Sequence, residues 1–595
     1  MEKRVADIIV DTLLENNVDT CFTVVGGGAM HLNNAFEINK ELDKTFCHHE
    51  QACAFAAEGY AKQCGKMAAV SVTSGPGAVN TLNGVYSAWV DSAPMIVIAG
   101  HPRYETTVEA CGLDLRCRGV QEFDIIPAVQ GMTKYAVMLK DANRVKYEVE
   151  KACHIAMEGR RGPVWISVPL DVQAKKVDVD KLERYQVEDE SGGASLKESI
   201  DEIITELRKA KRPCILTGSG LRTGAAMDQF YKMLEKVQIP VVGGALLSDI
   251  LPEDYKYFYG LSGNIGPRAG NFILQNADYI LVLANSMSNR QTGFNVEGFA
   301  PNAYITMVDA SADEGKKPGL NISKQVTCDI KEFLSLFNNR IDSNITTSGE
   351  WISYCENAYS RLKNMDMPEI EQDGRVPAKY FWSVFRERIP KDAAVCLGNS
   401  NCVIGIFQLG VKSLGQRVIT NYNAGSMGYD LPEAVGVAKA SDNEVYCVTG
   451  DGSVMMNLQE LETISYNKLP VKLVVFSNDG YGAIRQTCKN YFNGTYTGCD
   501  KNSGVDFPAF KDVANAFGFS YLHCKTVSEV AEKVDELVKA KGNVILEVDQ
   551  KLDDPVLPKV MSKLKEDGTF ETPTLLDMYP YLEETLVEEL KMEDK

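Results

Sequence analysis

The stretch 450–482, GDGSVMMNLQELETISYNKLPVKLVVFSNDGYG, decides the fold of this chain. It follows the apolar run 445–448 and contains a second apolar run, 471–476, with a helix-like segment between them. Each run ends in a short polar turn, so one strand–helix–strand unit separates the two turns. Because neighbouring parallel strands end at the same edge of a sheet, we expect both turns to meet there.

Asp451 lies in the first turn, where a strand gives way to a helix. Free backbone N–H groups at the helix start favour an anion, and the carboxylate is a hard oxygen ligand. Asn478 and the backbone carbonyl of Gly480 supply two more oxygens, which with two phosphate oxygens and a water complete an octahedral Mg²⁺ site. An ordinary βα turn without a ligand is the alternative. The pattern thus suits a diphosphate group that is bridged by the metal ion. The residues predicted to surround this diphosphate are Gly450, Gly452, Ser453 and Gly482.

Composition is ordinary for a globular protein of 595 residues, with 45% hydrophobic and 24% charged residues. The length favours several domains. The net charge of −19 argues against nucleic acid or an anionic membrane as the main partner. Sixteen cysteines occur without a CxxC pair, several inside apolar runs, which favours buried thiols over disulfides or zinc. The N-terminus reads as an amphipathic helix, so we expect a cytoplasmic protein.

Apolar runs alternate with helical patterns along most of the chain, which predicts parallel sheets covered on both faces. The charged stretch 175–195 reads as a linker, and 341–375 reads as a second connector without strand character. The predicted fold is therefore α/β, with three doubly wound parallel-sheet domains and a C-terminal arm. Their expected bounds are 1–175, 196–340 and 376–550 for the domains and 551–595 for the arm.

The spacing of the GDG turn and Asn478 resembles the thiamine-diphosphate-binding motif. Nearly the whole chain resembles the acetolactate synthase-like branch of the thiamine-diphosphate-dependent enzymes. The first segment resembles the pyrimidine-binding domain of that family in three places, VVGGGAMHLNNAF (24–36), HHEQACAFAAEGYA (48–61) and SVTSGPGAVNTLNGV (71–85). The resemblance implies that the second and third domains are the middle domain and the diphosphate-binding domain.

Glu50 matches the activating glutamate of the family. A carboxylate bonded to the aminopyrimidine ring promotes the tautomer that turns the weakly acidic C2–H of the cofactor into a carbanion. The plainer interpretation is a helix N-terminal glutamate favoured by the helix dipole. VQEFD (120–124) resembles a family segment that places Gln121 near the substrate, although a glutamine there can also serve backbone groups.

In the third domain, GNSN (398–401) matches a phosphate-contacting turn, with Asn399 and Ser400 at its polar positions. In NYNAGSMGYDLP (421–432), the resemblance gives Gly425 a carbonyl that accepts from the aminopyrimidine. It makes Met427 the apolar wedge that bends the cofactor, while the plainer interpretation of this methionine is core filler.

The middle domain resembles one that carries a structural FAD in the family. The implied FAD contacts are Arg161, Arg290 and Asp309, and related enzymes have the same fold without flavin. The family also joins the pyrimidine domain of one subunit to the diphosphate domain of another, so a homodimer or homotetramer is expected.

The resemblance implies decarboxylation of a 2-oxo acid, expected to be pyruvate, and carboligation of the two-carbon unit to an acceptor carbonyl. The acceptor is a second pyruvate, giving acetolactate, or a keto-sugar. Thr487 stands where true synthases carry a tryptophan, and this loop and the arm look more like carboligases of surface-sugar biosynthesis. Candidate acceptor contacts, each with a structural alternative, are His31, His49 and His101.

Two other functions are considered. One is a C–C-cleaving hydrolase of a cyclic diketone, and the other is a catalytically silent regulatory relative. Intact Glu50, Asp451 and Asn478 argue against the silent relative, because a scaffold has no need of all three.

Overall fold

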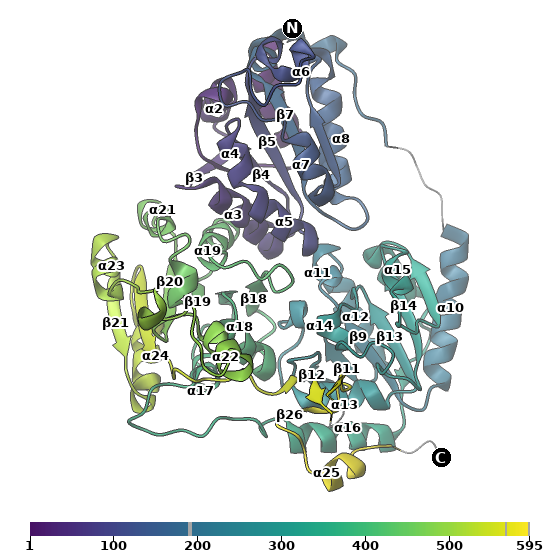
Figure 1. Cartoon of the computed structure of the whole chain (residues 1–595). Coiled ribbons are helices and arrows are strands. Elements are labelled where there is room, and N and C mark those ends of the chain that lie inside the picture. Colours follow the sequence, from purple (N-terminus) through teal and green to yellow (C-terminus); the bar gives the residue numbers. More distant parts are fainter. Residues whose placement is uncertain (188–192, 566–567, 593–595) are drawn as a thin grey trace.

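The computed structural model describes residues 1–187, 193–565 and 568–592. It has three α/β domains, each built on a parallel sheet of six strands, so the predicted fold class is confirmed. In Figure 1 the N-terminal domain is at the top, the middle domain at the right and the C-terminal domain at the left. The last part of the chain runs along the bottom, against the middle domain.

The N-terminal domain has the strand order β3-β2-β4-β5-β7-β6, and its central strands are buried along their whole length. A parallel sheet covered by helices on both faces requires such apolar strands. The strands are β2 (Thr20–Thr23), β3 (Asp43–Phe46), β4 (Ala68–Val72), β5 (Met95–His101), β6 (Tyr135–Met138) and β7 (Val164–Pro169). The main helices are α1 (Val5–Glu15), α2 (Met30–Ile38), α3 (Glu50–Cys64), α4 (Pro76–Asn80), α5 (Leu82–Val90) and α8 (Val145–Met157). Two short antiparallel strands, β1 (Glu2–Arg4) and β8 (Lys176–Asp178), close the domain.

The middle domain has the order β12-β11-β9-β13-β14-β15. Its strands are β9 (Pro213–Thr217), β11 (Val241–Gly243), β12 (Phe258–Leu261), β13 (Tyr279–Leu283), β14 (Tyr304–Asp309) and β15 (Lys324–Thr327). Its main helices are α10 (Gly193–Lys209), α12 (Met227–Lys236), α13 (Arg268–Asn276), α15 (Ile330–Arg340) and α16 (Gly349–Leu362).

The second connector proposed from the sequence contains regular structure, so this interpretation was wrong. β16 (Ile345–Thr346) pairs with β10 (Val237–Gln238), and α16 packs on α13. Ser348 caps α16 by accepting from the N–H of Trp351, whose ring is buried. The first linker also begins later than expected, after β8, and its residues 188–192 lie outside the described residues.

The C-terminal domain has the order β18-β17-β19-β20-β22-β21. Its strands are β17 (Ala394–Leu397), β18 (Arg417–Thr420), β19 (Val445–Gly450), β20 (Val471–Ser477), β21 (Ser520–Cys524) and β22 (Val544–Asp549). Its helices are α17 (Ala378–Phe385), α18 (Asn401–Leu409), α19 (Asp430–Ala440), α20 (Asp451–Val454), α21 (Glu460–Tyr466), α22 (Gly482–Tyr491), α23 (Phe510–Ala516) and α24 (Val530–Lys539). The arm adds the antiparallel pairs β23 (Lys559–Val560) with β26 (Met578–Tyr579) and β24 (Lys563–Leu564) with β25 (Phe570–Glu571), then α25 (Glu584–Glu589).

The N-terminal and C-terminal domains share one strand order, which the middle domain lacks. Numbered within each domain, both outer sheets run 2-1-3-4-6-5, whereas the middle sheet runs 3-2-1-4-5-6. In such open sheets, ligands bind beyond the carboxyl ends of the strands where the order reverses, between the first and third strands. In the C-terminal domain this point lies between β17 and β19, which end in the GNSN and GDG turns.

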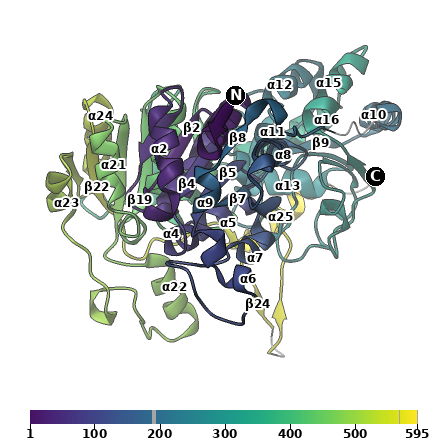
Figure 2. The same cartoon turned by 90° about the horizontal axis from the view of Figure 1, so that it is seen from above.

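Helices α3 and α19 each follow the second strand of their domain and pack against each other in the middle of Figure 1. Seen from above, the N-terminal domain lies over both of its neighbours (Figure 2). Glycines allow this close approach, because a Cβ added at Gly436 would lie 1.8 Å from the carbonyl oxygen of Ala56. The contact fixes the N-terminal domain on the C-terminal domain.

Candidate active site

Asp451 ties together the two turns predicted to form the metal site. Its Oδ2 accepts from the N–H groups of Asn478 at 2.9 Å and Gly480 at 3.2 Å. Its Oδ1 accepts from the N–H of Gly452 at 2.8 Å. Burial raises the pKa of this carboxyl to about 6. A buried acid held by three backbone donors gains from a nearby cation, so this site fits a divalent metal.

Asn478 completes the same turn through its side chain. Its Nδ2 donates to Oε1 of Gln550 at 3.0 Å, which directs Oδ1 to the opposite side. There Arg485, a buried residue of α22, donates to the carbonyl oxygen of Asn478 at 2.7 Å and to its Oδ1 at 3.3 Å. Sequence reasoning missed both partners. Gln550 is separated from Asn478 by a long stretch of chain, and no local motif marks Arg485.

The glycines of the GDG segment leave room on one side only. A Cβ at Gly450 would meet no atom within 4 Å, whereas one at Gly452 would lie 2.3 Å from the ring of Tyr481. A Cβ at Gly482 would lie 3.2 Å from Nδ2 of Asn478. Gly450 therefore faces open space next to Asp451, and this space leaves room for a diphosphate.

The Ser453 hydroxyl is engaged within the protein. It donates to Oδ2 of Asp430 at 2.9 Å and accepts from the N–H of Gly428 at 2.9 Å. Asp430 is fully buried, and burial raises its pKa. Ser453 thus holds the loop that carries Met427 against the GDG turn, and its side chain faces protein rather than a ligand.

The GNSN turn and the Met427 loop are joined to each other. Asn399 donates through Nδ2 to the carbonyl oxygen of Ser426 at 3.0 Å. Gly425 has a φ of 62°, a left-handed conformation that favours glycine, and a Cβ there would meet only Asn399 Oδ1, at 3.9 Å. Met427 is half-buried, and Ser400 adopts a φ of 55° just before α18. Four predicted contacts therefore lie on two hydrogen-bonded turns.

Glu50 begins α3, with the ring of His49 as its N-cap. The half-buried Glu50 carboxylate accepts from Nδ2 of Asn80 at 3.0 Å. A Cβ added at Gly77 would lie 3.2 Å from its Oε1. The carboxylate is thus directed at the glycine turn that follows β4.

Gln121 meets the other side of this turn. A Cβ at Gly75 would lie 2.4 Å from the Gln121 carbonyl oxygen, and the Gln121 side chain is exposed. Its φ of 55° is uncommon for a residue with a side chain. The neighbouring Glu122 orders the segment, because its carboxylate accepts from the N–H groups of Val108 and Gly119 at 2.6 and 2.7 Å. The structure therefore brings the two predicted catalytic residues to one turn.

The start of α3 also contacts the C-terminal domain. Gln51 accepts through Oε1 from Nδ2 of Asn457 at 3.0 Å, and the N–H of His48 donates to Glu460 at 3.0 Å. Ser426, which precedes Met427, donates to Oδ1 of Asn83 at 2.9 Å. Glu50 thus lies next to residues that are hydrogen-bonded to the C-terminal domain, which carries the Met427 loop and the GDG turn. In the part of the chain that the structure describes, its side-chain hydrogen-bond partner is Asn80.

Three family models match the chain in the order of its domains. The N-terminal TPP binding domain of thiamine pyrophosphate enzymes matches residues 3–126, the central domain 200–337 and the C-terminal TPP binding domain 399–548. Together these ranges cover more than two-thirds of the chain. The chain belongs to the thiamine pyrophosphate enzyme family.

Relatives of this thiamine pyrophosphate enzyme align along nearly its whole length. The acetolactate synthase isozyme 2 large subunit of Escherichia coli (strain K12) is 27% identical over 91% of this chain and 95% of its own. The acetolactate synthase large subunit of Lactococcus lactis subsp. lactis (strain IL1403) is 27% identical over 94% and 95%. The probable acetolactate synthase large subunit of Methanococcus aeolicus is 28% identical over 91% of each. The prediction of a thiamine-diphosphate-dependent enzyme of the acetolactate synthase-like branch is confirmed.

In the middle domain of this thiamine pyrophosphate enzyme, two of the three predicted FAD contacts lie together. Arg161 and Asp309 line a small cavity of about 70 Å³. A second cavity, of about 190 Å³, adjoins it, and Ser219 lines both. The Nε of Arg161 is buried without a hydrogen-bond partner in the described ranges, and burial raises the pKa of Asp309. Arg290 lies apart from this cavity, with its guanidinium 4.1 Å from the ring centroid of Tyr422.

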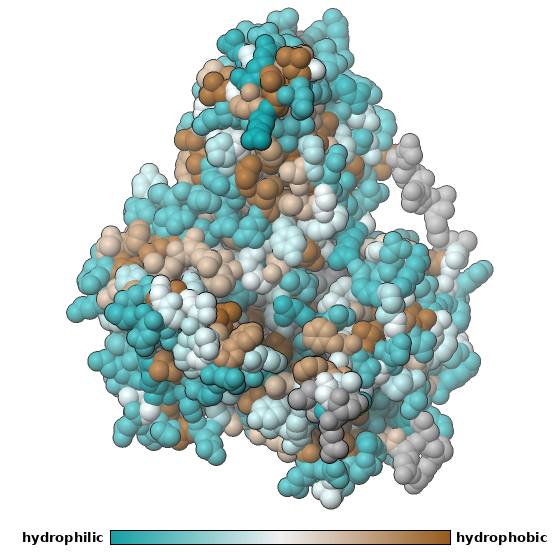
Figure 3. All heavy atoms as spheres, in the orientation of Figure 1, coloured by the Kyte–Doolittle hydropathy of each residue, from teal (hydrophilic) through white to brown (hydrophobic). Residues whose placement is uncertain are grey.

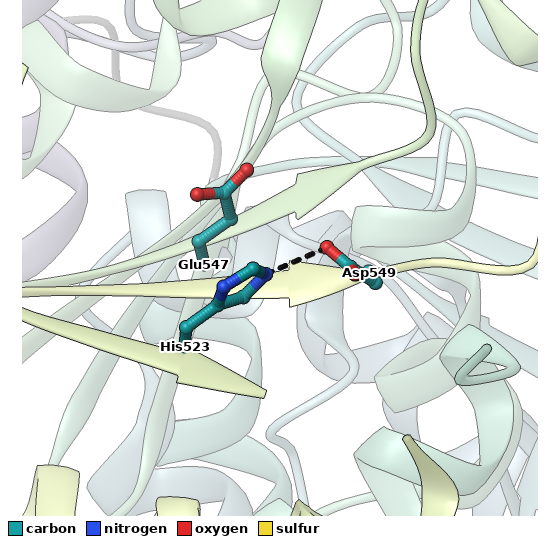
Figure 4. Close-up of side chains that lie close together, drawn as sticks. All are labelled: His523, Glu547 and Asp549. Atoms are coloured by element: carbon teal, nitrogen blue, oxygen red, sulfur yellow. Dashed lines mark hydrogen bonds and ion pairs between the residues drawn. The ribbon is translucent and has the colours of Figure 1, made fainter. Parts of the chain in front are cut away.

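The carboxyl edge of the C-terminal sheet carries a further group of polar side chains. His523 lies on β21, and Glu547 and Asp549 lie on the neighbouring β22. Figure 4 shows the His523 ring directed at Asp549, with a hydrogen bond of 2.8 Å, and the Glu547 carboxylate turned away. Glu547 instead accepts from the hydroxyl of Tyr521 at 2.5 Å. Protein donors satisfy both carboxylates, so we interpret the group as a tie between β21 and β22.

Proposed function

We propose that this enzyme decarboxylates pyruvate and transfers the remaining two-carbon unit to an acceptor carbonyl. One observation carries the proposal: a single buried carboxylate, Asp451, joins the GDG turn to the Asn478 turn. The GDG turn follows β19, which borders the point where the strand order of the sheet reverses, and the Asn478 turn follows the next strand, β20. When bound, thiamine diphosphate supplies a nucleophilic carbon and an electron sink for decarboxylation. The names of the acetolactate synthase relatives support the choice of substrate.

The residues of the chain would bind the metal and the cofactor, hold a proton and orient the substrate. Asp451 and Asn478, with the Gly480 carbonyl, would hold Mg²⁺, and the turns around Gly450 and Ser400 would hold the diphosphate. Glu50 would hold a proton at the pyrimidine ring of the cofactor, where a half-buried carboxylate acts with little screening. Met427 would support the cofactor between its two ends, and Gln121 would orient the substrate from the exposed segment.

Mg²⁺ and FAD are both part of the proposal. The Asp451 donor set fits Mg²⁺, because it offers hard oxygens at a helix start. The orphaned Arg161 Nε and the Asp309 carboxyl at the end of β14 fit a dinucleotide, whose phosphate and ribose need such partners. The purified protein should release FAD on denaturation, and a protein without flavin absorbance before or after added FAD would contradict this part.

We further propose a homo-oligomer. Large apolar side chains are exposed around Gln121, and Figure 3 shows apolar residues gathered over the N-terminal domain. The exposed members of this segment are Leu113, Leu115, Val120 and Phe123. A second copy that covered this face would bury them and enclose the exposed Gln121. Sedimentation should show a dimer or tetramer, and a monomer at all concentrations would refute the assembly.

A cytoplasmic location is also proposed. It is supported by the sixteen cysteines, which are all free thiols and mostly buried. Among the described residues, no helix combines the length and the apolar character of a membrane span.

The proposed reaction is tested with pyruvate labelled at C1. Purified protein with thiamine diphosphate, Mg²⁺ and FAD should release labelled CO₂, and mass spectrometry should identify the product formed with and without added acceptors. A hydrolase of a cyclic diketone would release no CO₂ from pyruvate, so the absence of labelled CO₂ would contradict the proposal.

A further inference from the structure

A polar cavity of about 390 Å³ lies between α22, the GNSN turn and the C-terminal arm. Four described segments line it: the loop after α14 (Asn289–Thr292), the GNSN turn, the helix α22, and the arm through residues 556–562 and Thr572. Most lining side chains carry a hydroxyl or an amide. These are Ser400, Gln486, Thr487, Asn490, Tyr491, Ser562 and Thr572. No acidic residue is among the described residues that line the cavity.

Lys559 is the cation of this cavity. It lies half-buried on β23, and within 1–187, 193–565 and 568–592 its ammonium group has no hydrogen-bond or ion-pair partner. Burial lowers its pKa, and no carboxylate among the described residues offsets this effect. Nearby lysines differ, because Lys489 pairs with Asp553 at 2.9 Å and Lys563 pairs with Asp577. A half-buried, unpaired ammonium is costly unless an anion joins it.

The cavity adjoins the predicted cofactor site. Ser400 belongs to both, and Asn399 beside it is bonded to the loop that carries Met427. Thr487 lies on the wall formed by α22 and donates its hydroxyl to the carbonyl oxygen of Ala483 at 3.1 Å. A small side chain at this position leaves the cavity open, and Phe294, 63% exposed, gives it one apolar wall.

We propose that this cavity binds the acceptor and that Lys559 pairs with a phosphate group on it. The acceptor would be a hydroxylated, sugar-like carbonyl compound, because hydroxyl and amide groups that line a cavity suit hydroxyls more than an alkyl chain. The ammonium supplies the charge-assisted contact that fixes the phosphate. The inference rests on the proposed carboligation, since it names the class of its acceptor.

The binding step is tested without cofactor, so that it does not depend on activity. Calorimetry measures the affinity for dihydroxyacetone phosphate and for dihydroxyacetone. The proteins compared are the wild type, Lys559→Met and Lys559→Arg. Lys489→Met, on the surface of α22, is the matched control. We expect the wild type to prefer the phosphate ester by about tenfold, the gain typical of a bond to a charged group. Lys559→Met should lose this preference, and Lys559→Arg and Lys489→Met should keep it. An equal preference in Lys559→Met would overturn the proposal.

The acceptor assay uses the complete enzyme and separates the two claims. Labelled CO₂ from pyruvate reports the proposed function, and its absence would contradict that function while the calorimetry still judges Lys559. With CO₂ released, Lys559→Met should raise the KM for dihydroxyacetone phosphate about tenfold and change the KM for dihydroxyacetone less than twofold. If the wild type joins pyruvate only to pyruvate, and Lys559→Met weakens that reaction instead, the sugar-like acceptor is refuted.

Discussion

The carboxyl edges of the N-terminal and C-terminal sheets differ sharply, although both sheets have the strand order 2-1-3-4-6-5. In the C-terminal domain, Asp451, Asn478 and Gly480 are already joined by hydrogen bonds within one chain. In the N-terminal domain, Glu50 is half-buried with one side-chain partner, and Gln121 is exposed on an apolar segment. In the proposed function, one fold thus carries the diphosphate at an edge closed by hydrogen bonds (the closed end) and the catalytic residues at an open edge (the open end). The open end is the part that another subunit would complete.

Replacing Glu50 with Gln tests the open end and should have the largest effect. The amide keeps the size of the side chain but cannot hold a negative charge at the pyrimidine ring. We expect the rate of CO₂ release to fall on the order of 10³-fold, the middle of the range for loss of a positioned acid–base group. Binding of thiamine diphosphate, measured by calorimetry, should change little. Near-normal exchange of the cofactor C2 proton in this variant would show that Glu50 has no such role.

Replacing Asp451 with Asn tests the closed end. The amide leaves one oxygen acceptor where the carboxylate had two, so the N–H donors of Asn478 and Gly480 and the metal compete for it. Mg²⁺-dependent binding of thiamine diphosphate should weaken on the order of 100-fold, at least the cost of losing an outer metal partner. Calorimetry with and without EDTA measures this. Wild-type affinity in this variant would show that Asp451 does not hold the metal, and the proposed difference between the two sheet edges would be wrong.

Replacing Gly436 with Ala tests the joint between the two domains. The added Cβ would lie 1.8 Å from the Ala56 carbonyl oxygen, so α3 and α19 must separate. We expect a loss of about 3 kcal/mol in the free energy of unfolding, the upper range for overpacking. Gly349→Ala is the control, because a Cβ there meets no atom within 4 Å. Equal urea midpoints for the two variants would mean that the α3–α19 contact is not tight.

Local patterns sufficed for the fold and for the turns of the C-terminal domain. The run 445–448 and the turn after it appear as β19 and the start of α20, because strand and turn chemistry act within a few residues. The helix α16 was missed although Trp351, Cys355, Ala358 and Leu362 follow a helical period. The absence of strand signals there was taken as the absence of structure.

Long-range contacts were beyond the sequence. Ser453 is predicted to lie beside the diphosphate, but the sequence does not indicate that its hydroxyl bonds to Asp430. The resemblance groups Arg290 with Arg161, and it does not indicate that the Arg290 guanidinium lies over the ring of Tyr422 in another domain. Gln550, which bonds to Asn478, follows β22, and Lys559, which lines the neighbouring cavity, lies on β23; no local motif marks either of them.

Charged side chains are buried where α3 packs on α19. Their titration should change the free energy of unfolding less than the substitutions above change affinity, rate or packing. Lys62 forms ion pairs with Glu58 at 2.7 Å and with Asp91 at 2.8 Å, and Glu433 also acts on its charge. One ammonium cannot offset three buried carboxylates, and burial raises the pKa of Glu58 from 4.5 to about 7.

The sign of the pH effect follows from this shift. Between pH 4.5 and 7 the folded protein binds more protons at Glu58 than the unfolded chain does, so its contribution lowers stability as the pH rises and is constant above that window. Glu58→Gln removes the titration, so the stability of this variant relative to the wild type should rise across the window, by roughly 2 to 3 kcal/mol between pH 5 and 8. Urea midpoints at pH 5, 6, 7 and 8 measure the difference, with the exposed Glu41→Gln as control. A difference that stays flat or falls would mean that Glu58 is charged in the folded protein and forms an ion pair with Lys62 at the joint between the two domains.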